Sequence, residues 1–280
     1  MTRVSHWYGR LGNNIQQVAV ATMAAEMLKS TFNLDIDHEI IKKHQATFGQ
    51  GTEELSSKWF YWEGPYKEVG IEPAYIYQNM RRICRSILPH LDVPTQEVQD
   101  ADTICIHIRS GDIFARDRAP SADYVPNPLY FYLQLLERFA KAIVVTEPDA
   151  DNPIVAILEK HPKVTVQSKS VAEDFATLLS AKNLASSGVG TFAIAAALCS
   201  QNIENFFCTD LHITEHLNFN MLMNTDVSLN VMALDNYIKP GEWKNDEQQR
   251  KKVRTSRGAW SDVWRSNQTY RSELVSQRIL

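Results

Sequence analysis

The sequence TICIHIRSGD, residues 103–112, decides the fold class of this chain. It is mostly apolar up to Ile108 and then stops on Arg109, Gly111 and Asp112. Such a run is typical of a buried strand that delivers charged groups to the edge of a sheet. Because ligands of open α/β sheets bind beyond the carboxyl ends of the strands, we expect Arg109 to meet an anion there, phosphate above all.

Apolar runs and helical periodicity alternate on both sides of this strand, which predicts α/β units and a parallel, doubly wound sheet. The chain opens with a predicted strand (residues 4–8), a glycine turn (9–14), a helix through Lys29 and a returning strand (32–36). A further helix is predicted over residues 80–88. Beyond residue 112 the predicted helices are 129–140, 152–159, 171–180 and 193–198, and the predicted strands are 142–146 and 164–167.

The length of 280 residues, 44% of them hydrophobic, is enough for two domains of about 100 to 150 residues each. A polar stretch over residues 92–100 is a candidate linker. We therefore expect an N-terminal domain over residues 1–98 and a second domain over residues 99–235. Residues 236–280 would form a basic C-terminal extension that packs across both.

The charge balance, 29 Lys and Arg against 33 Asp and Glu for a net charge of −4, gives no overall basic field and predicts no nucleic-acid partner. The extension is different, with ten basic against five acidic residues. Its basic and aromatic residues, which include Trp260, Trp264 and Arg265, could rest on anionic lipid, or could belong to a solvated or domain-bridging helix.

The four cysteines show neither a CxxC pair nor a zinc-like spacing, and this predicts core thiols in a reducing compartment. The N-terminus lacks the uninterrupted apolar core of a signal peptide, and no stretch approaches 18 consecutive apolar residues. We expect a cytoplasmic protein, with peripheral attachment at the inner membrane as a further option.

Two glycine turns are candidate anion sites. The segment Ser186-Ser187-Gly188-Val189-Gly190-Thr191-Phe192 offers hydroxyls and unpaired backbone N–H groups at the start of a helix, which suits a phosphate; a capped helix entry without a ligand is the alternative. The turn Gly9-Arg10-Leu11-Gly12-Asn13 lacks the third glycine of the dinucleotide fingerprint and the GK[ST] of a P-loop. It would allow close backbone approach to a ligand, with Arg10 or Asn13 in a cleft, or would be a tight turn with Asn13 as helix N-cap.

Metal-ligating patterns are weak. Two Asp-x-Asp sequences occur, at residues 35–37 and 149–151, and both are better interpreted as solvated carboxylates. His212 and His216 have i, i+4 spacing, but the acidic residue of an HExxH motif is out of place. The sequence therefore predicts no metal site.

Three motifs stand in a particular order: GRLGNN at 9–14, HIRSGD at 107–112 and DFATLLSAKNLASSGVGTFA at 174–193. Together they resemble the fucosyltransferase superfamily, that is, the bacterial α1,2-fucosyltransferases and, more distantly, the α1,6- and protein O-fucosyltransferases. The resemblance spans residues 4–200 and is concentrated in these motifs.

The resemblance implies a GT-B architecture, two Rossmann-like domains facing a cleft, and an inverting transfer that needs no metal or cofactor. Arg109 would bind the donor β-phosphate and offset the charge of the leaving group. The remaining donor-binding residues would be His107 and Asp174 around the nucleotide, Ser186, Ser187, Gly190, Thr191 and Phe192 near the phosphates, and Gly12 and Asn13 across the cleft.

One departure from the motif of that superfamily is Ser110, which stands where HxRRGD has a second arginine. The missing cation weakens the case for GDP-fucose and leaves nucleotide-diphosphate binding intact. For the general base, position favours Asp112, with Asp117 behind it. Asp112 could instead cap a helix or hold Arg109 in place.

The sequence thus predicts a glycosyltransferase that moves a sugar, fucose by default, from a nucleotide-diphosphate donor, GDP-linked by default, to a hydroxyl of a cell-surface polysaccharide, glycan or lipid-linked saccharide. The alternatives are a glycosyltransferase with a different activated donor and a catalytically inactive carbohydrate-binding relative.

Overall fold

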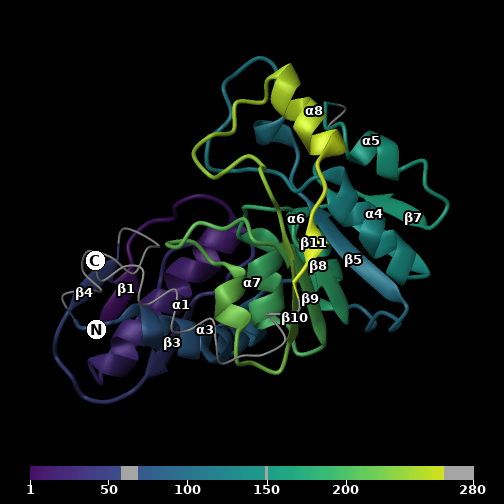
Figure 1. Ribbon diagram of the computed structural model, residues 1–280. Helices are drawn as coiled ribbons and strands as arrows, with labels where there is room; N and C mark the ends of the chain where they lie inside the picture. Colours follow the sequence, from purple (N-terminus) through teal and green to yellow (C-terminus); the bar gives the residue numbers. More distant parts are fainter. Residues whose placement is uncertain (58–68, 149–150, 262–280) are drawn as a thin grey trace.

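A computed structural model describes residues 1–57, 69–148 and 151–261, which form an α/β fold with two separate sheets (Figure 1). The smaller sheet has the strand order β3-β2-β1-β4, in which β1 pairs in parallel with both neighbours and β3 is antiparallel. Its strands are β1 (Thr2–Val4), β2 (Thr31–Leu34), β3 (His44–Thr47) and β4 (Leu55–Ser57).

The larger sheet has the strand order β11-β10-β9-β8-β5-β6-β7 and is parallel except for β11. Its strands are β5 (Thr103–Ile108), β6 (Lys141–Thr146), β7 (Val164–Gln167), β8 (Asn183–Ala185), β9 (Asn205–Thr209), β10 (Ser228–Ala233) and β11 (Ala259–Trp260). The chain runs outward from β5 to β7 and then returns to β8 on the other side of β5. This reversal is the topological switch point, where ligands of doubly wound sheets bind.

The helices bring the two sheets together. α7 is apolar all round and buried, as expected for a helix enclosed on every side, and it packs against α1, α3, α6 and β8. The helices are α1 (Leu11–Met27), α3 (Pro73–Ile87), α4 (Leu129–Arg138), α5 (Val155–Leu158), α6 (Val171–Leu179), α7 (Phe192–Cys199) and α8 (Glu247–Thr255). Short 3-10 turns lie at Leu88–His90, Gly111–Ile113 and Phe219–Leu222.

Two hydrophobic cores lie on opposite faces of the larger sheet. One is shared with α1 and α3 and contains Cys105 of β5; the other lies toward α4 and α8 and contains Ile104, Ile106 and Ile108 of the same strand. All four cysteines are free and buried, as the sequence predicts. The first core runs across the boundary at residue 98, so the two halves are packed against one another.

Most predicted elements are present, with corrected boundaries. The first strand ends at Val4 rather than residue 8, because the following residues form a turn in which the Tyr8 N–H donates to Gln17 and the Tyr8 carbonyl accepts from Asn14. α3 starts at Pro73, seven residues before the predicted start, with proline in its favoured first position. The N-cap of α1 is Arg10 and not Asn13.

The described part of the C-terminal extension packs against the second half of the chain. Trp243 is buried with its ring 5.7 Å from that of Phe114, and its Nε1–H donates to the Ile113 carbonyl over 2.9 Å. Trp260 lies in β11 opposite Met232 of β10, and the Arg138 guanidinium lies over its ring. Trp264 and Arg265 lie outside the described residues. Within the described ranges no helix has the length and apolarity that crossing a membrane requires.

Candidate active site

A pocket of about 180 Å³ lies where the three sequence motifs meet. Motif residues on its wall are Arg10 and Gly12 from the first motif, His107 and Arg109 from the second, and Asp174, Gly190, Thr191 and Phe192 from the third. Val145, Thr146, Glu147 and Val171 complete the lining. The fold thus brings into one wall segments that lie as far apart in the chain as Arg10 and Phe192.

The first and third motifs touch directly at this pocket. The Thr191 hydroxyl donates to Asn13 Oδ1 over 2.7 Å, and a Cβ atom on Gly12 would lie 2.8 Å or less from the Thr191 backbone. Glycine at position 12 is therefore what allows the start of α1 to approach the start of α7. Neither helix start has a side-chain cap or an acidic residue in its first turn, so the N–H groups and positive dipole ends of both favour an anion.

Arg109 is held by contacts on two sides. Its Nε and Nη2 atoms lie 3.2 and 2.7 Å from the two carboxylate oxygens of Asp112, and its guanidinium carbon lies 3.8 Å from the ring centre of Tyr124. The side chain is 16% exposed. A bidentate carboxylate and a stacked ring fix the plane of the guanidinium, so it is oriented before any ligand binds.

Asp112 is kept ionised by its neighbours. Burial raises its pKa. The hydrogen bonds and charge of Arg109, with smaller effects from Arg10 and Arg118, lower the pKa by more than burial raises it, so that it lies below the ordinary aspartate value. A carboxylate with a lowered pKa is a weaker base. Of the three roles that the sequence leaves open for Asp112, general base, helix cap and support of Arg109, this geometry favours the support of Arg109.

His107 is neutral in the pocket. Burial and the charges of Arg109 and Arg10 lower its pKa to about 3. Its ring lies 5.1 Å from that of Phe192, and its Nδ1 atom is buried without a hydrogen-bond partner among the described residues. The neutral ring adds no charge beside Arg109 and leaves one nitrogen for a ligand.

Asp174 lies in the first turn of α6, where its carboxylate accepts from the Gln167 side chain over 2.8 Å and from the Lys169 N–H over 3.2 Å. The side chain is buried yet reaches the pocket wall. It ties the loop between β7 and α6 to the pocket.

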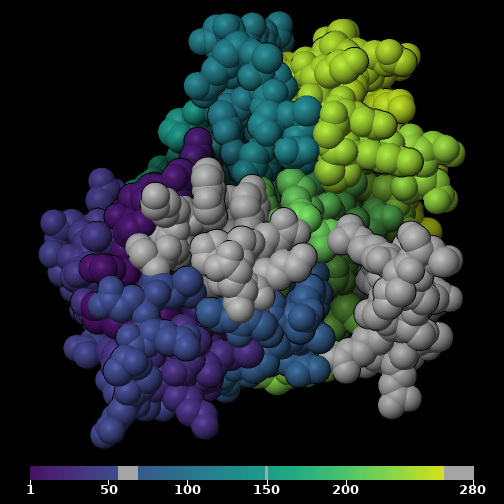
Figure 2. All heavy atoms as spheres, turned by 90° about the vertical axis from the view of Figure 1, so that its left-hand side faces the viewer, coloured from purple at the N-terminus to yellow at the C-terminus, as the bar shows by residue number. Residues whose placement is uncertain are grey.

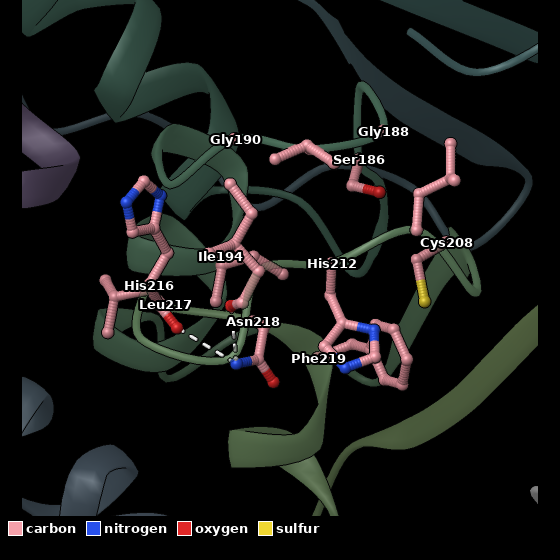
Figure 3. A pocket seen from close by; sticks show the side chains of 13 residues that line it. Ser186, Gly188, Gly190, Ile194, Cys208, His212, His216, Leu217, Asn218 and Phe219 are labelled. Carbon is pink, nitrogen blue, oxygen red and sulfur yellow. Dashed lines mark hydrogen bonds between the residues drawn. The ribbon is translucent and has the colours of Figure 1, made fainter. Parts of the chain in front are cut away.

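Ser186 and Ser187 lie elsewhere: neither is among the described residues that line this pocket. Ser187 is buried near Gly190, and Ser186 lines a second crevice of about 10 Å³ together with Gly188 and Gly190 (Figure 3). Gly190 borders both cavities. Both serines are therefore buried in the loop before α7 and do not form the wall of the larger pocket.

Figure 3 also shows the two histidines considered as a zinc pair, and their rings point apart. His212 Nδ1 lies 3.1 Å from the Asp210 carbonyl, and the His216 ring lies 6.1 Å from that of Tyr124. The described ranges contain no cluster of three or more His, Cys, Asp or Glu that could hold a metal ion. Of the two Asp-x-Asp sequences, residues 149–150 lie outside the described ranges.

Ser110 does not face the pocket. It is fully buried; its hydroxyl lies 3.0 Å from that of Thr146 and accepts from the Asn152 amide over 2.7 Å. Side chains alternate along a strand, so Ser110 follows the face of Ile106 and Ile108. Serine in place of the second arginine of HxRRGD therefore takes no cation from the pocket wall. The alternation of side chains could have been used to predict from the sequence that residue 110 faces away from the pocket.

Glu147 is a pocket residue that the sequence reasoning missed. It directly follows β6, and its Oε1 atom pairs with Arg10 of the first motif across the cleft. Arg10 also lies 4.0 Å from Asp112. The signal was available in principle, because parallel strands β5 and β6 end at the same edge and the residues after both should lie together.

No protein-family model matches the chain, and no curated protein matches it in sequence. Among solved structures, the chain is similar to a crystal structure of the O-fucosyltransferase POFUT1 in complex with GDP. The two are 9% identical in sequence, and the match covers 74% of this chain and 97% of that one with a TM-score of 0.36. The fold itself is α/β with parallel Rossmann-like sheets.

Proposed function

We propose that the pocket binds the diphosphate of a nucleotide sugar and that the protein is an inverting, metal-independent glycosyltransferase of GT-B type. The observation that carries this proposal is the convergence of Arg109 with two uncapped helix starts on one pocket. Each of these features attracts an anion, and together they match a diphosphate better than a single carboxylate. The three motifs that resemble fucosyltransferases supply most of the wall.

Arg109 would act mainly on the leaving group. Breaking the bond between sugar and phosphate builds negative charge on the nucleoside diphosphate, and a fixed cation beside it stabilises that charge in the transition state. At 4 Å the Coulomb attraction is about 4 kcal/mol for an effective dielectric constant near 20. Because Asp112 and Tyr124 already orient the guanidinium, little energy is spent on reorganising it.

The rest of the pocket would hold the nucleoside and sugar. His107 offers an unpaired nitrogen beside the Phe192 ring, and Asp174 offers a carboxylate at the opposite loop. Because Ser110 is buried and is not part of the pocket lining, the serine in place of the second arginine of HxRRGD does not count against a GDP-linked donor. GDP-fucose therefore remains the default donor, and a glycan or lipid-linked saccharide the default acceptor.

A donor with another activated sugar remains the first alternative, and a non-catalytic carbohydrate-binding relative is the second. The second is favoured by one observation: the carboxylate of Asp112 is paired with Arg109, and that of Glu147, on the pocket wall, is paired with Arg10. Slow hydrolysis of the bound donor in the absence of an acceptor distinguishes an enzyme from a non-catalytic relative. Hydrolysis supports the enzyme, and binding without hydrolysis supports the relative.

The test of the proposal is a thermal-unfolding screen with GDP, UDP, CMP and dTDP. A ligand at about 100 times its Kd stabilises the native state by about 2.7 kcal/mol, which raises the melting temperature by several degrees. We expect a diphosphate, GDP first, to do so and CMP to have a smaller effect. If none of the four shifts the transition, the proposal is wrong.

Two further assignments belong to this proposal. Residues 1–98 would be the acceptor-side domain and residues 99–235 the donor-side domain, although one core joins them. The lipid contact of the extension would have to use residues other than Arg250 and Trp260, because Arg250 donates to main-chain carbonyls and Trp260 is part of β11. Co-sedimentation with anionic liposomes at low and high salt tests that contact, and a cytoplasmic location remains a prediction.

A further inference from the structure

A third cavity, of about 420 Å³, lies between the loop after Asp112 and the start of α8. We call it the basic groove; it is lined by Ala115, Arg116, Arg118, Ala119, Pro120, Lys244, Asn245, Glu247 and Arg250. Figure 2 shows the two segments, teal and yellow, side by side at the top of the molecule. Its volume lies within the range of small-ligand pockets, about 300 to 1,000 Å³.

The charge of the groove is positive although the whole chain carries a net charge of −4. Four of its residues are cations and one, Glu247, is acidic. Glu247 is paired with Arg254 outside the groove, and Arg116 with Asp151. Arg118 and Lys244 have no ion-pair partner within the described ranges.

The walls of the groove are joined by hydrogen bonds. Arg250 is 6% exposed and donates to the carbonyls of Phe114 and Asp151 over 2.8 and 2.9 Å. Asn245 donates to the Ala115 carbonyl over 3.0 Å, while its own Oδ1 atom is buried without a hydrogen-bond partner in the part of the chain that is described. The groove thus combines exposed cations, and one buried cation held by hydrogen bonds, with one unused acceptor. This combination suits a ligand that carries both an oxyanion and hydroxyl groups.

The groove lies on the loop that follows Asp112, the residue paired with Arg109. Ala115 lines the groove, and its N–H donates to the Gly111 carbonyl over 3.0 Å, which places it within one turn of Asp112. The charge of Arg118 also contributes to the lowered pKa of that aspartate. A molecule that occupied the groove would therefore lie close to the Arg109–Asp112 pair. This is the side from which an acceptor could approach a donor bound at Arg109.

We propose that the basic groove binds an oxyanion of the acceptor glycan, a carboxylate or a phosphate, and so orients the acceptor toward the donor pocket. This inference rests on the proposed glycosyltransferase function and adds the chemical class of its acceptor, an acidic saccharide. A nucleic acid is disfavoured because the described lining contains no aromatic ring on which bases could stack.

The test is calorimetric binding of hexagalacturonate, with maltohexaose as its neutral counterpart. Inorganic phosphate and free galacturonate serve as competitors, and a DNA oligonucleotide serves as an alternative polyanion. We expect hexagalacturonate to bind, maltohexaose to bind far more weakly, and the affinity for hexagalacturonate to fall with salt. In the double variant Arg118→Ala, Lys244→Ala, the affinity should drop about tenfold, since exposed charges contribute modestly each. Lys252→Ala is the matched control, because Lys252 is on α8 but outside the groove.

GDP binding is measured on the same proteins and should not change in any of these variants. Competition by phosphate at lower concentration than by free galacturonate would assign the oxyanion to a phosphate, and the reverse order to a carboxylate. The inference is overturned if neither hexagalacturonate nor inorganic phosphate binds, if the double variant binds them like the control, or if DNA binds more tightly. If the unaltered protein does not bind GDP, that result counts against the proposed function instead.

Discussion

Replacing Gly12 by alanine tests the convergence of α1 and α7 that builds the pocket. The added Cβ would lie 2.5 Å from Thr191 Oγ1 and 2.7 and 2.8 Å from the Thr191 backbone C and O atoms. Because ordinary contacts between nonbonded carbons are about 3.5 to 4.0 Å, the two helix starts must separate by about 1 Å. Overpacking of this kind costs about 1 to 3 kcal/mol, which outweighs the gain of about 0.5 to 1 kcal/mol for alanine in a helix.

The matched control is Gly190→Ala on the same pocket wall, where a Cβ would meet only the Ser187 hydroxyl, at 3.4 Å. We expect Gly12→Ala to lower the melting temperature by about 2 to 8 °C and GDP affinity by about tenfold. Gly190→Ala should stay within about 0.5 kcal/mol of the original stability. Thermal unfolding and calorimetric titration with GDP measure both effects. Equal melting temperatures and affinities for Gly12→Ala and the unaltered protein would refute the close approach.

Three further predictions concern the residues around Arg109. Ser110→Arg should cost more than about 4 kcal/mol in urea unfolding, because it buries an unpaired charge, whereas Ser110→Ala should cost only about 1 to 2 kcal/mol; a stable Ser110→Arg variant would contradict the buried position. Since the pKa of His107 is lowered in the folded state to about 3, the unfolded chain binds a proton first as pH falls. His107 should therefore reduce stability by about 1.4 kcal/mol per pH unit between about pH 6.5 and pH 3. The stability difference between the unaltered protein and His107→Asn should change with pH over that window, and a constant difference would show that folding does not lower the pKa of His107. Asp112→Asn should weaken GDP binding about three- to tenfold by loosening Arg109; abolished turnover with unchanged GDP affinity would instead identify Asp112 as the base.

The sequence predicted most of the helices and strands because they depend on local patterns. The apolar runs at β5 and β6 and the capping box of Ser170 and Glu173 at α6 are readable in a few consecutive residues. The contact between Gly12 and Thr191 cannot be predicted from a few consecutive residues, because it depends on how α7 packs against α1. Local spacing alone could not show that Ser186 and Ser187 lie behind the pocket wall.

Other differences between the sequence predictions and the structure have an electrostatic origin. The spacing of Arg109 and Asp112 allows either a base or an ion-pair partner, and only the geometry shows both carboxylate oxygens engaged. Glu147 carries no motif of its own and gains its importance from Arg10, which reaches it from the other half of the chain. Such pairs form between segments whose distance along the sequence gives no sign of their contact.

The most direct test of the central claim is a calorimetric titration of GDP into the unaltered protein, Arg109→Ala and Arg109→Lys. Removing a charged hydrogen bond should weaken binding by about 10- to 100-fold in Arg109→Ala. Arg109→Lys should recover only part of this, since an ammonium keeps the charge without the planar fork. Arg254→Ala, which removes an exposed cation from α8, is the control and should bind GDP normally. If the unaltered protein binds GDP and Arg109→Ala binds it equally well, the diphosphate does not lie at Arg109 and the account is wrong.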